Sequence, residues 1–309
     1  MLTIDFNKIF MFFLFIICIV SVNQSYSLCF YPPQNVNKDT IIGSIQTTQV
    51  QINEDFSDIA MKFGVGYYEI LEANPGIDPD DPPVNTAIVV PTQYLLPTEL
   101  KKNTIVVNLA EMRLYYLPNS EDKIYIFPVG IGKEGWDTPI GERKIIEKIM
   151  HPMWKVPDSI YKFRTYLGEK IPKIVPYGPN NPLGNFALRL SQGEYLMHGT
   201  NSPRGIGRRS SAGCIRLYNQ DIEVLYHNVF IGTKVIIINE PYKISVIDKN
   251  LYLEAHMPLM EQRLQMDKNM KGVIKLVMDT AKKYNLVVDR AKVMCIVNEH
   301  IGVPIKINL

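Results

Sequence analysis

The sequence predicts a mainly β domain at the centre of the chain, preceded by a small strand–helix–helix–strand module and followed by a small α/β region. The 21 prolines and 17 tyrosines favour strands and turns over a helical bundle. The central third alternates short runs rich in Ile, Val and Tyr with glycine and proline turns. The 309 residues also exceed one small domain, because ~100–200 residues per domain is usual.

Composition excludes several classes of function. Hydrophobic residues make up 46% of the chain and charged residues 21%, which is the balance of a globular protein. The formal net charge is only +2, so nucleic acid is not expected as a partner. Four cysteines in this length exclude a disulfide scaffold. No metal-ligand spacing or phosphate-binding loop occurs, and we expect neither a metal nor a cofactor.

Residues 1–27 have the features of a signal peptide. The unbroken apolar run from Ile9 to Val20 fits the core of such a signal and is short for a membrane span of ~20 residues. Ser25 and Ser27 place small residues at −3 and −1 of a cut after Ser27. The alternatives are an uncleaved anchor and lipid attachment at Cys29, although the residue before this cysteine is not small. Export predicts an oxidising compartment.

Residues 46–97 form a small acidic module in this interpretation. Polar and apolar residues alternate from Gln49 to Ile52, as in a half-buried strand, and 88–90 reads as a returning strand. Between them, two apolar stripes at helical spacing predict two short helices, the second closed by Asn74-Pro75-Gly76. The first stripe consists of Phe56, Ile59, Ala60 and Phe63. The segment holds eight acidic side chains and one basic one.

The A-N-P-G-I-D-P run from Ala73 to Pro79 and the I-V-V-P ending at Pro91 resemble a LysM domain. This resemblance implies binding to glycan that contains N-acetylglucosamine, here peptidoglycan. The acidity of the module would not repel a neutral glycan, whereas it would repel an anionic polymer. The alternative is a structural cap that binds nothing.

The central domain is predicted over residues 103–239. No clear helical stripe appears in it before the short segment Asp221–His227. Val156-Pro157 and Val175-Pro176 are expected to be extended, because a residue before proline is pushed out of the helical region. The strand-like segments are Thr104–Leu109, Arg113–Leu117, Lys123–Val129, Phe186–Leu190, Tyr195–His198 and Gly232–Ile238.

The stretch from Tyr195 to Leu217 carries the candidate chemistry. Cys214 follows a glycine turn, and His198 lies sixteen residues upstream at the end of a short apolar strand. A thiol nucleophile needs a base or a cation beside it, because a free thiol is mostly protonated near neutrality. The backbone N–H groups of Gly213 and Cys214 are candidates for an oxyanion hole. A buried, inert thiol is the alternative.

Four arginines crowd around this cysteine in the sequence: Arg204, Arg208, Arg209 and Arg216. If they are also near it in space, they would lower the pKa of the thiol and attract carboxylates, which arginine can hold with two hydrogen bonds. A solvated surface face is the alternative.

The wording H-G-T-N…I-G…S-x-G-C-I-R-L in this stretch resembles the signature of the L,D-transpeptidases, the YkuD-type catalytic domain. From about Gln49 to Asn308 the chain resembles the exported, LysM-containing branch of Gram-negative bacteria, which includes the enzymes that attach Braun-type lipoprotein to the wall. This implies a YkuD-like β-sandwich and a periplasmic location. Further family-like segments are Asn108–Leu117, Phe127–Gly132, Thr138-Pro139, Trp154–Pro157 and Gly178–Gly184.

The resemblance implies roles for individual residues. Cys214 would be the nucleophile and His198 its base and proton donor, with the backbone carbonyl of Gly199 orienting the imidazole. Many relatives carry a histidine immediately before the Gly-Cys pair, where this chain has Ala212. Ala212 therefore puts any mechanism with a second histidine in doubt.

Three further residues are expected to support the substrate or its oxyanion. Ser211 matches the serine of the signature, Gly213 belongs to the turn before the nucleophile, and Arg216 matches the arginine that follows it.

The implied reaction is acyl transfer. Cys214 attacks the carbonyl of the L-centre of diaminopimelate at position 3 of a stem peptide, and D-Ala at position 4 leaves. An amine then resolves the thioester: a second diaminopimelate, giving a 3→3 crosslink, or a lysine of an outer-membrane lipoprotein. Water would make the enzyme a carboxypeptidase, and a non-catalytic wall tether is the third hypothesis. The resemblance also implies acylation of Cys214 by carbapenems.

Residues 240–309 are predicted to form a C-terminal subdomain with a helix over Met270–Tyr284. It could serve as a wall of the substrate channel or as a packing subdomain, and we expect packing. Whether Cys29 and Cys295 pair is left open. The remaining histidines are expected to be ordinary packed or surface residues: His151, His227, His256 and His300.

Overall fold

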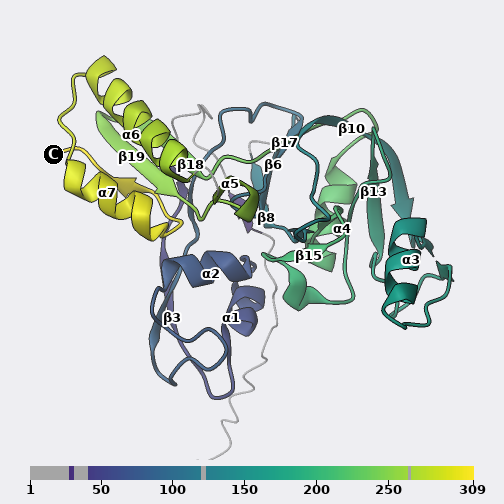
Figure 1. Cartoon of the computed structure of the whole chain (residues 1–309). Coiled ribbons are helices and arrows are strands. Elements are labelled where there is room, and N and C mark those ends of the chain that lie inside the picture. Colours follow the sequence, from purple (N-terminus) through teal and green to yellow (C-terminus); the bar gives the residue numbers. More distant parts are fainter. Residues whose placement is uncertain (1–27, 31–40, 120–122, 264–265) are drawn as a thin grey trace, which may run out of the picture.

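The computed structural model describes residues 28–30, 41–119, 123–263 and 266–309 (Figure 1). The predicted signal peptide lies outside these residues. Within the described ranges, no helix combines the length and the apolar character that a membrane span needs.

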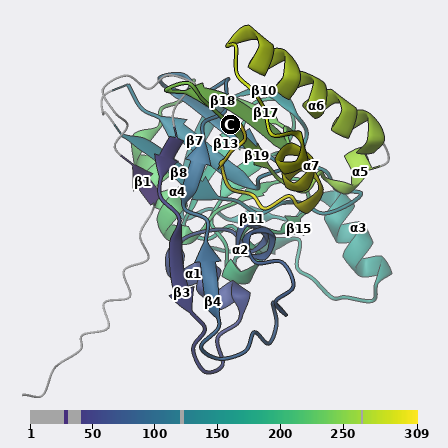
Figure 2. The ribbon, with the colours of Figure 1, turned by 90° about the vertical axis from the view of Figure 1, so that its left-hand side faces the viewer.

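The centre of the molecule is a nine-stranded sheet with the order β1-β8-β7-β6-β17-β10-β13-β14-β16. Neighbouring strands are antiparallel except for the pairs β6–β17 and β14–β16, which are parallel. Figure 2 shows β1 beside β8 at one edge. The strands span Leu28–Phe30 (β1), Thr104–Asn108 (β6), Arg113–Leu117 (β7), Ile124–Pro128 (β8), Gly141–Met150 (β10), Phe186–Leu190 (β13), Leu196–His198 (β14), Ile215–Arg216 (β16) and Lys234–Ile238 (β17).

The strands β6, β7 and β8 are buried on both faces, and their successive side chains point alternately into two cores. Ile105 and Val107 of β6 pack into one core with the helix α4 (Asn219–Asn228), whereas Val106 packs into a second core. That second core includes Tyr94 of β5 (Gln93–Leu95), which pairs with β2 (Ile41–Gly43). The predicted mainly β architecture is confirmed.

The N-terminal module has the predicted strand–helix–helix–strand order: β3 (Gln46–Gln49), α1 (Phe56–Phe63), α2 (Tyr67–Ala73) and β4 (Ala87–Val90). Asp55 and Asp58 form a capping box at the start of α1, and Gly64 ends the helix in the left-handed conformation. The prediction of a strand over Gln49–Ile52 was wrong by three residues. Asn53 has a φ of 60° and turns the chain there, which leaves Ile52 exposed.

The C-terminal region folds as a three-stranded sheet covered by two helices. The stripe Val273, Val277 and Ala281 of α6 is buried against the sheet, but Leu276, expected on the same face, is exposed. Its elements are β18 (Tyr242–Ile247), β19 (Asn250–Ala255), α5 (Met260–Arg263), α6 (Met266–Lys283), α7 (Arg290–Glu299) and β20 (Ile305–Lys306). We keep 46–97, 103–239 and 240–309 as the proposed division of the chain.

An arm between β10 and β13 contains a helix that the sequence did not predict. It consists of β11 (Trp154–Lys155), α3 (Asp158–Tyr166) and β12 (Ile174–Val175), and Figure 1 shows α3 at one end of the molecule. Each of the nine residues of α3 is at least partly exposed. The helix therefore lacks the buried apolar face by which an amphipathic helix is recognised in a sequence. Phe163 of α3 contacts Trp136 with the ring centroids 5.7 Å apart.

Candidate active site

Sheet register brings the cysteine and the histidine together. Cys214 lies in a turn between β15 (Arg209–Ser211) and β16, and β16 runs parallel to β14 with His198 opposite Arg216. The Leu196 backbone forms a hydrogen bond that lowers the pKa of the Cys214 thiol. Cys214 therefore sits at the same edge of the sheet as His198, sixteen residues away in the sequence.

The imidazole of His198 is held by its neighbour in the chain. The side chain is buried, and its Nδ1 lies 2.6 Å from the carbonyl oxygen of Gly199. Since a carbonyl only accepts, Nδ1 carries the hydrogen and Nε2 is left as the basic nitrogen. This geometry fits the orienting role expected of Gly199, which stays a prediction.

Electrostatics keep both groups neutral at rest. Burial and the charge of Arg216 lower the pKa of His198 to about 3, and the Gly199 carbonyl opposes this only in part. Burial raises the pKa of the Cys214 thiol, although the charges of Arg216 and Arg189 act in the opposite direction. The resting pair is therefore a thiol and a neutral imidazole, which suits general-base activation rather than a preformed ion pair.

Ser211 ties the nucleophile turn together. Its Oγ donates to the carbonyl of Cys214 at 2.5 Å and accepts from the N–H of Gly213 at 3.1 Å. Gly213 has a φ of 98°, and a Cβ there would come within 2.8 Å of the Tyr195 ring, so the turn requires glycine. Because Ser211 already engages the Gly213 N–H, the N–H of Cys214 is the better oxyanion candidate in this conformation.

The expected cluster of four arginines around the cysteine is confirmed only for Arg216. Arg204 forms ion pairs with Asp55 and Asp58 of the N-terminal module. The guanidinium carbon of Arg208 lies 3.2 Å from the ring centroid of Tyr67, which also belongs to that module. Both guanidinium groups are therefore engaged by the N-terminal module.

Arg209 is the third arginine with partners elsewhere, because it binds Asp137 and Glu261. Arg189 is the residue that sequence reasoning missed: it comes from β13, and its charge acts on the Cys214 thiol.

The N-terminal module packs directly on the loop that leads to the nucleophile. The N–H of Tyr68 donates to the Gly207 carbonyl at 3.2 Å, and the hydroxyl of Tyr218 donates to the Val65 carbonyl at 3.2 Å. A Cβ on Gly207 would come within 2.4 Å of the Cα of Gly66. The module is therefore seated on the catalytic domain through close backbone contacts.

A buried charge cluster joins all three parts of the chain, and no local sequence pattern predicts it. Arg113 of β7 contacts Glu69 of α2 at 2.9 Å, Glu111 at 2.8 Å and Glu254 of β19 at 3.4 Å. Lys243 of β18 lies 3.0 Å from both Glu111 and Glu254. Of these residues, only Glu111 and Arg113 are close in the sequence, so the fold alone reveals the cluster as a whole.

His256 belongs to the same cluster, contrary to the expectation that it is an ordinary packed residue. Its two ring nitrogens each lie 2.9 Å from a carboxylate, one of Glu72 and one of Glu254. Glu111, Glu254 and His256 have the donor atoms of a metal site, with ligand atoms within 4.8 Å of one another. Arg113 and Lys243 already neutralise these carboxylates, so the residues do not fit a cation.

The other histidines make ring contacts in the described part of the chain, in keeping with packing roles. His151 lies against Tyr177, His227 against Phe186, and His300 against Tyr242. Cys295 is exposed on α7 and is not in a disulfide among the described residues, while the side chain of Cys29 lies outside them.

Together these features define a class of protein: a β-sheet enzyme domain with a cysteine–histidine site, fused to a small βααβ module. Comparison with known proteins gives the family. Residues 102–237 match the L,D-transpeptidase catalytic domain (YkuD), and residues 48–91 match the LysM domain. The chain belongs to the L,D-transpeptidase family of enzymes, as the resemblance in the sequence predicted.

One relative matches nearly the whole length of the chain, and another matches about two thirds of it. "Probable L,D-transpeptidase ErfK/SrfK" of Salmonella typhimurium is 35% identical over 97% of this chain and 96% of its own. "Probable L,D-transpeptidase YcfS" of Escherichia coli is 42% identical over 66% of this chain and 65% of its own. A solved L,D-transpeptidase from Mycobacterium tuberculosis H37Rv overlaps with a TM-score of 0.32 at 18% identity, over 43% of this chain and 56% of that one.

Proposed function

We propose that the protein is a peptidoglycan L,D-transpeptidase that works through a thioester on Cys214. The observation that carries the proposal is the pairing of a turn cysteine with a buried histidine whose Nδ1 is fixed by the Gly199 carbonyl at 2.6 Å. This arrangement places a basic Nε2 on β14 and a thiol in the turn directly before β16, the neighbouring strand.

Proton transfer and attack occur together in this mechanism. The low pKa of His198 and the raised pKa of Cys214 oppose a free thiolate, so Nε2 accepts the thiol proton as the sulfur bonds to the diaminopimelate carbonyl. The imidazolium then gives this proton to the nitrogen of D-Ala, and the C–N bond breaks. The N–H of Cys214 stabilises the oxyanion, with Arg216 nearby.

The second half-reaction transfers the acyl group to an amine, either a diaminopimelate side chain or a lipoprotein lysine. Water as acceptor would give an L,D-carboxypeptidase, and a chain without chemistry would be a peptidoglycan tether. The LysM module would hold the glycan, and its close contacts with the loop before Cys214 would keep the glycan and the site in a fixed relation. Such an enzyme would be exported and act in the periplasm.

Incubation of the purified protein with a disaccharide-tetrapeptide, followed by mass spectrometry, tests the proposal. We expect a crosslinked dimer that lacks one D-Ala, and no reaction with Cys214→Ala. Tripeptide alone would favour hydrolysis or an acceptor absent from the mixture. An unchanged substrate with folded wild-type protein would support the tether. A carbapenem should add its mass to wild type and not to Cys214→Ala.

A further inference from the structure

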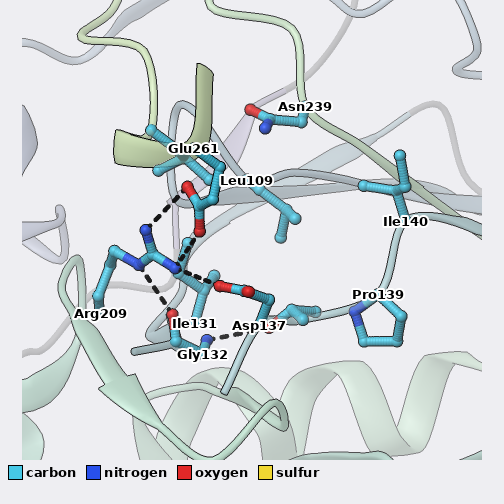
Figure 3. A pocket seen from close by; sticks show the side chains of 11 residues that line it. Leu109, Ile131, Gly132, Asp137, Pro139, Ile140, Arg209, Asn239 and Glu261 are labelled. Atoms are coloured by element: carbon cyan, nitrogen blue, oxygen red, sulfur yellow. Dashed lines mark hydrogen bonds and ion pairs between the residues drawn. The ribbon is translucent and has the colours of Figure 1, made fainter. Parts of the chain in front are cut away.

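A cavity of about 280 Å³ lies beside the nucleophile turn (Figure 3). Residues 132–138 form a loop that borders both features. The N–H of Lys133 donates to the Ser211 carbonyl at 3.0 Å, and the carbonyl oxygen of Asp137 lies 3.2 Å from where a Cβ on Gly213 would stand. The carboxylate of Asp137 lines the cavity. One residue thus contacts the nucleophile turn with its backbone and the cavity with its side chain.

The rim of the cavity carries one guanidinium and two carboxylates, shown in Figure 3. Arg209 donates to Asp137 at 2.6 Å and to Glu261 at 2.5 and 3.0 Å, and its Nε donates to the Gly132 carbonyl at 2.9 Å. Four of its five N–H groups are therefore used. The three charges sum to −1, and the carboxylates keep free lone pairs, so the rim is suited to a cation that donates hydrogen bonds.

The walls behind the rim are apolar. They consist of Leu109, Ile131, Pro139, Ile140 and Leu259. An alkyl chain of a few methylene groups would bury its carbons against such walls and gain ~0.8 kcal/mol for each buried CH₂. Carboxylates at the entrance and apolar walls behind match a primary amine on an alkyl chain.

We propose that this cavity binds the amine acceptor of the second half-reaction, with its ammonium at Asp137 and Glu261 and its carbon chain against the apolar walls. The proposal rests on the transpeptidase function proposed above. Diaminopimelate and lysine side chains both present this chemistry. Glu261 and Leu259 belong to the C-terminal region, which thereby forms part of the substrate channel. Glu261 also raises the pKa of Asp137, chiefly through a side-chain hydrogen bond between the two carboxyl groups and further through its negative charge.

The transfer step consumes the amine and the thioester and returns the free thiol. The ammonium releases one proton to solvent, and the neutral amine attacks the thioester carbonyl. The new amide C–N bond forms as the C–S bond breaks. The second amine proton passes through His198 to the departing thiolate, which regenerates the thiol of Cys214.

Two half-reactions separate acceptor binding from acylation. We would first measure the rate at which disaccharide-tetrapeptide forms the Cys214 adduct by intact mass, in wild type, Asp137→Asn and Glu261→Gln. We would then measure the apparent KM for two amine probes, a disaccharide-tripeptide and Nα-acetyl-lysine amide. Glu169→Gln is the matched control, because Glu169 is also an exposed carboxylate paired with an arginine.

We expect both rim variants to form the adduct at the wild-type rate within twofold, and the KM for the amine to rise at least tenfold. The control should change neither value. If the KM rises more for the disaccharide-tripeptide than for Nα-acetyl-lysine amide, the acceptor is the diaminopimelate amine of peptidoglycan. If it rises more for the lysine probe, the acceptor is a lysine of a protein. Normal adduct with an unchanged amine KM would overturn this proposal alone, as would an equal loss of both half-reactions. No adduct in wild type would overturn the proposed function itself.

Discussion

Arg113 of the central sheet and Glu69 of the LysM module form an ion pair of 2.9 Å in which both side chains are almost completely buried. Two more carboxylates, Glu111 and Glu254, contact the same guanidinium. Taking such charges out of water is costly, and the cost is offset only while every partner is in place. The catalytic domain, the LysM module and the C-terminal region therefore depend on one another at this point.

Removing the central cation should destabilise the whole chain. We expect Arg113→Met to lower the free energy of unfolding by about 3–5 kcal/mol, because buried carboxylates lose their partner. The free energy of unfolding can be measured by urea denaturation monitored by circular dichroism. Lys234→Met, which breaks the exposed pair with Glu142, should cost less than about 1 kcal/mol. Similar losses for the two variants would show that the buried cluster is not a structural centre.

His256 should make the stability depend on pH. The carboxylates of Glu72 and Glu254 raise its pKa to about 9 from an ordinary value near 6.5, despite its burial. The raised pKa contributes stability that is complete below about pH 6.5 and is lost as the pH rises through 9. At ~1.4 kcal/mol per pKa unit this amounts to about 3 kcal/mol.

Measurement of the urea midpoint from pH 6 to pH 9.5 checks the prediction. Wild type should lose stability across this window, and His256→Gln should be less stable at pH 6 and show a flatter curve. An equally steep decline in the variant would assign the pH dependence to another group.

The seating of the LysM module should depend on Gly207. Its φ is 68°, and a Cβ would come within 2.2 Å of the Tyr67 backbone nitrogen, so alanine adds a clash to the conformational strain. Gly76 is the matched control, because its φ is 81° but a Cβ there would meet nothing within 4 Å.

We expect Gly76→Ala to cost about 1 kcal/mol and Gly207→Ala distinctly more. Limited proteolysis should also cut the Gly207→Ala variant between residues 96 and 104, where the module joins the central domain. Equal stability and equal protection in the two variants would contradict the docked arrangement.

Helices and strands with a buried face could be predicted from the spacing and composition of neighbouring residues. The stripe of Phe56 and Ile59 located α1 because a helix buries one face, and the strands around Val106 were recognised from their composition. The pairing of β6 with β17 could not be foreseen, since it joins residues about 130 positions apart. The helix α3 was missed because it buries no side chain.

The candidate site likewise combines residues that a local motif predicts with contacts that only the fold creates. Cys214 and His198 can be proposed as a pair from the sequence because one short motif contains both residues. The arginines were misplaced, because neighbours in the sequence can point in different directions. Arg204 and Arg209 find their carboxylates at Asp55 and Glu261, which are remote in the sequence. Partners that only the fold brings together leave no pattern in a single stretch.

Arg216 should set the reactivity of the nucleophile. Its charge lowers the pKa of the Cys214 thiol, so Arg216→Ala should raise that pKa further. The thiolate is the reactive form, and below the pKa each unit of increase reduces it about tenfold. The rate of alkylation by iodoacetamide at pH 7.5 should therefore fall, and its midpoint should move to higher pH.

Arg216→Lys keeps the charge and should restore much of the rate, whereas Arg204→Ala, whose side chain binds the LysM module, should leave the profile unchanged. In the protein that begins at residue 28, Cys29 and Cys295 must both be replaced by serine in every variant so that alkylation reports on Cys214 alone. If Arg216→Lys is alkylated as slowly as Arg216→Ala, a positive charge at this position is not sufficient. Arg216 would then act through the shape of the turn.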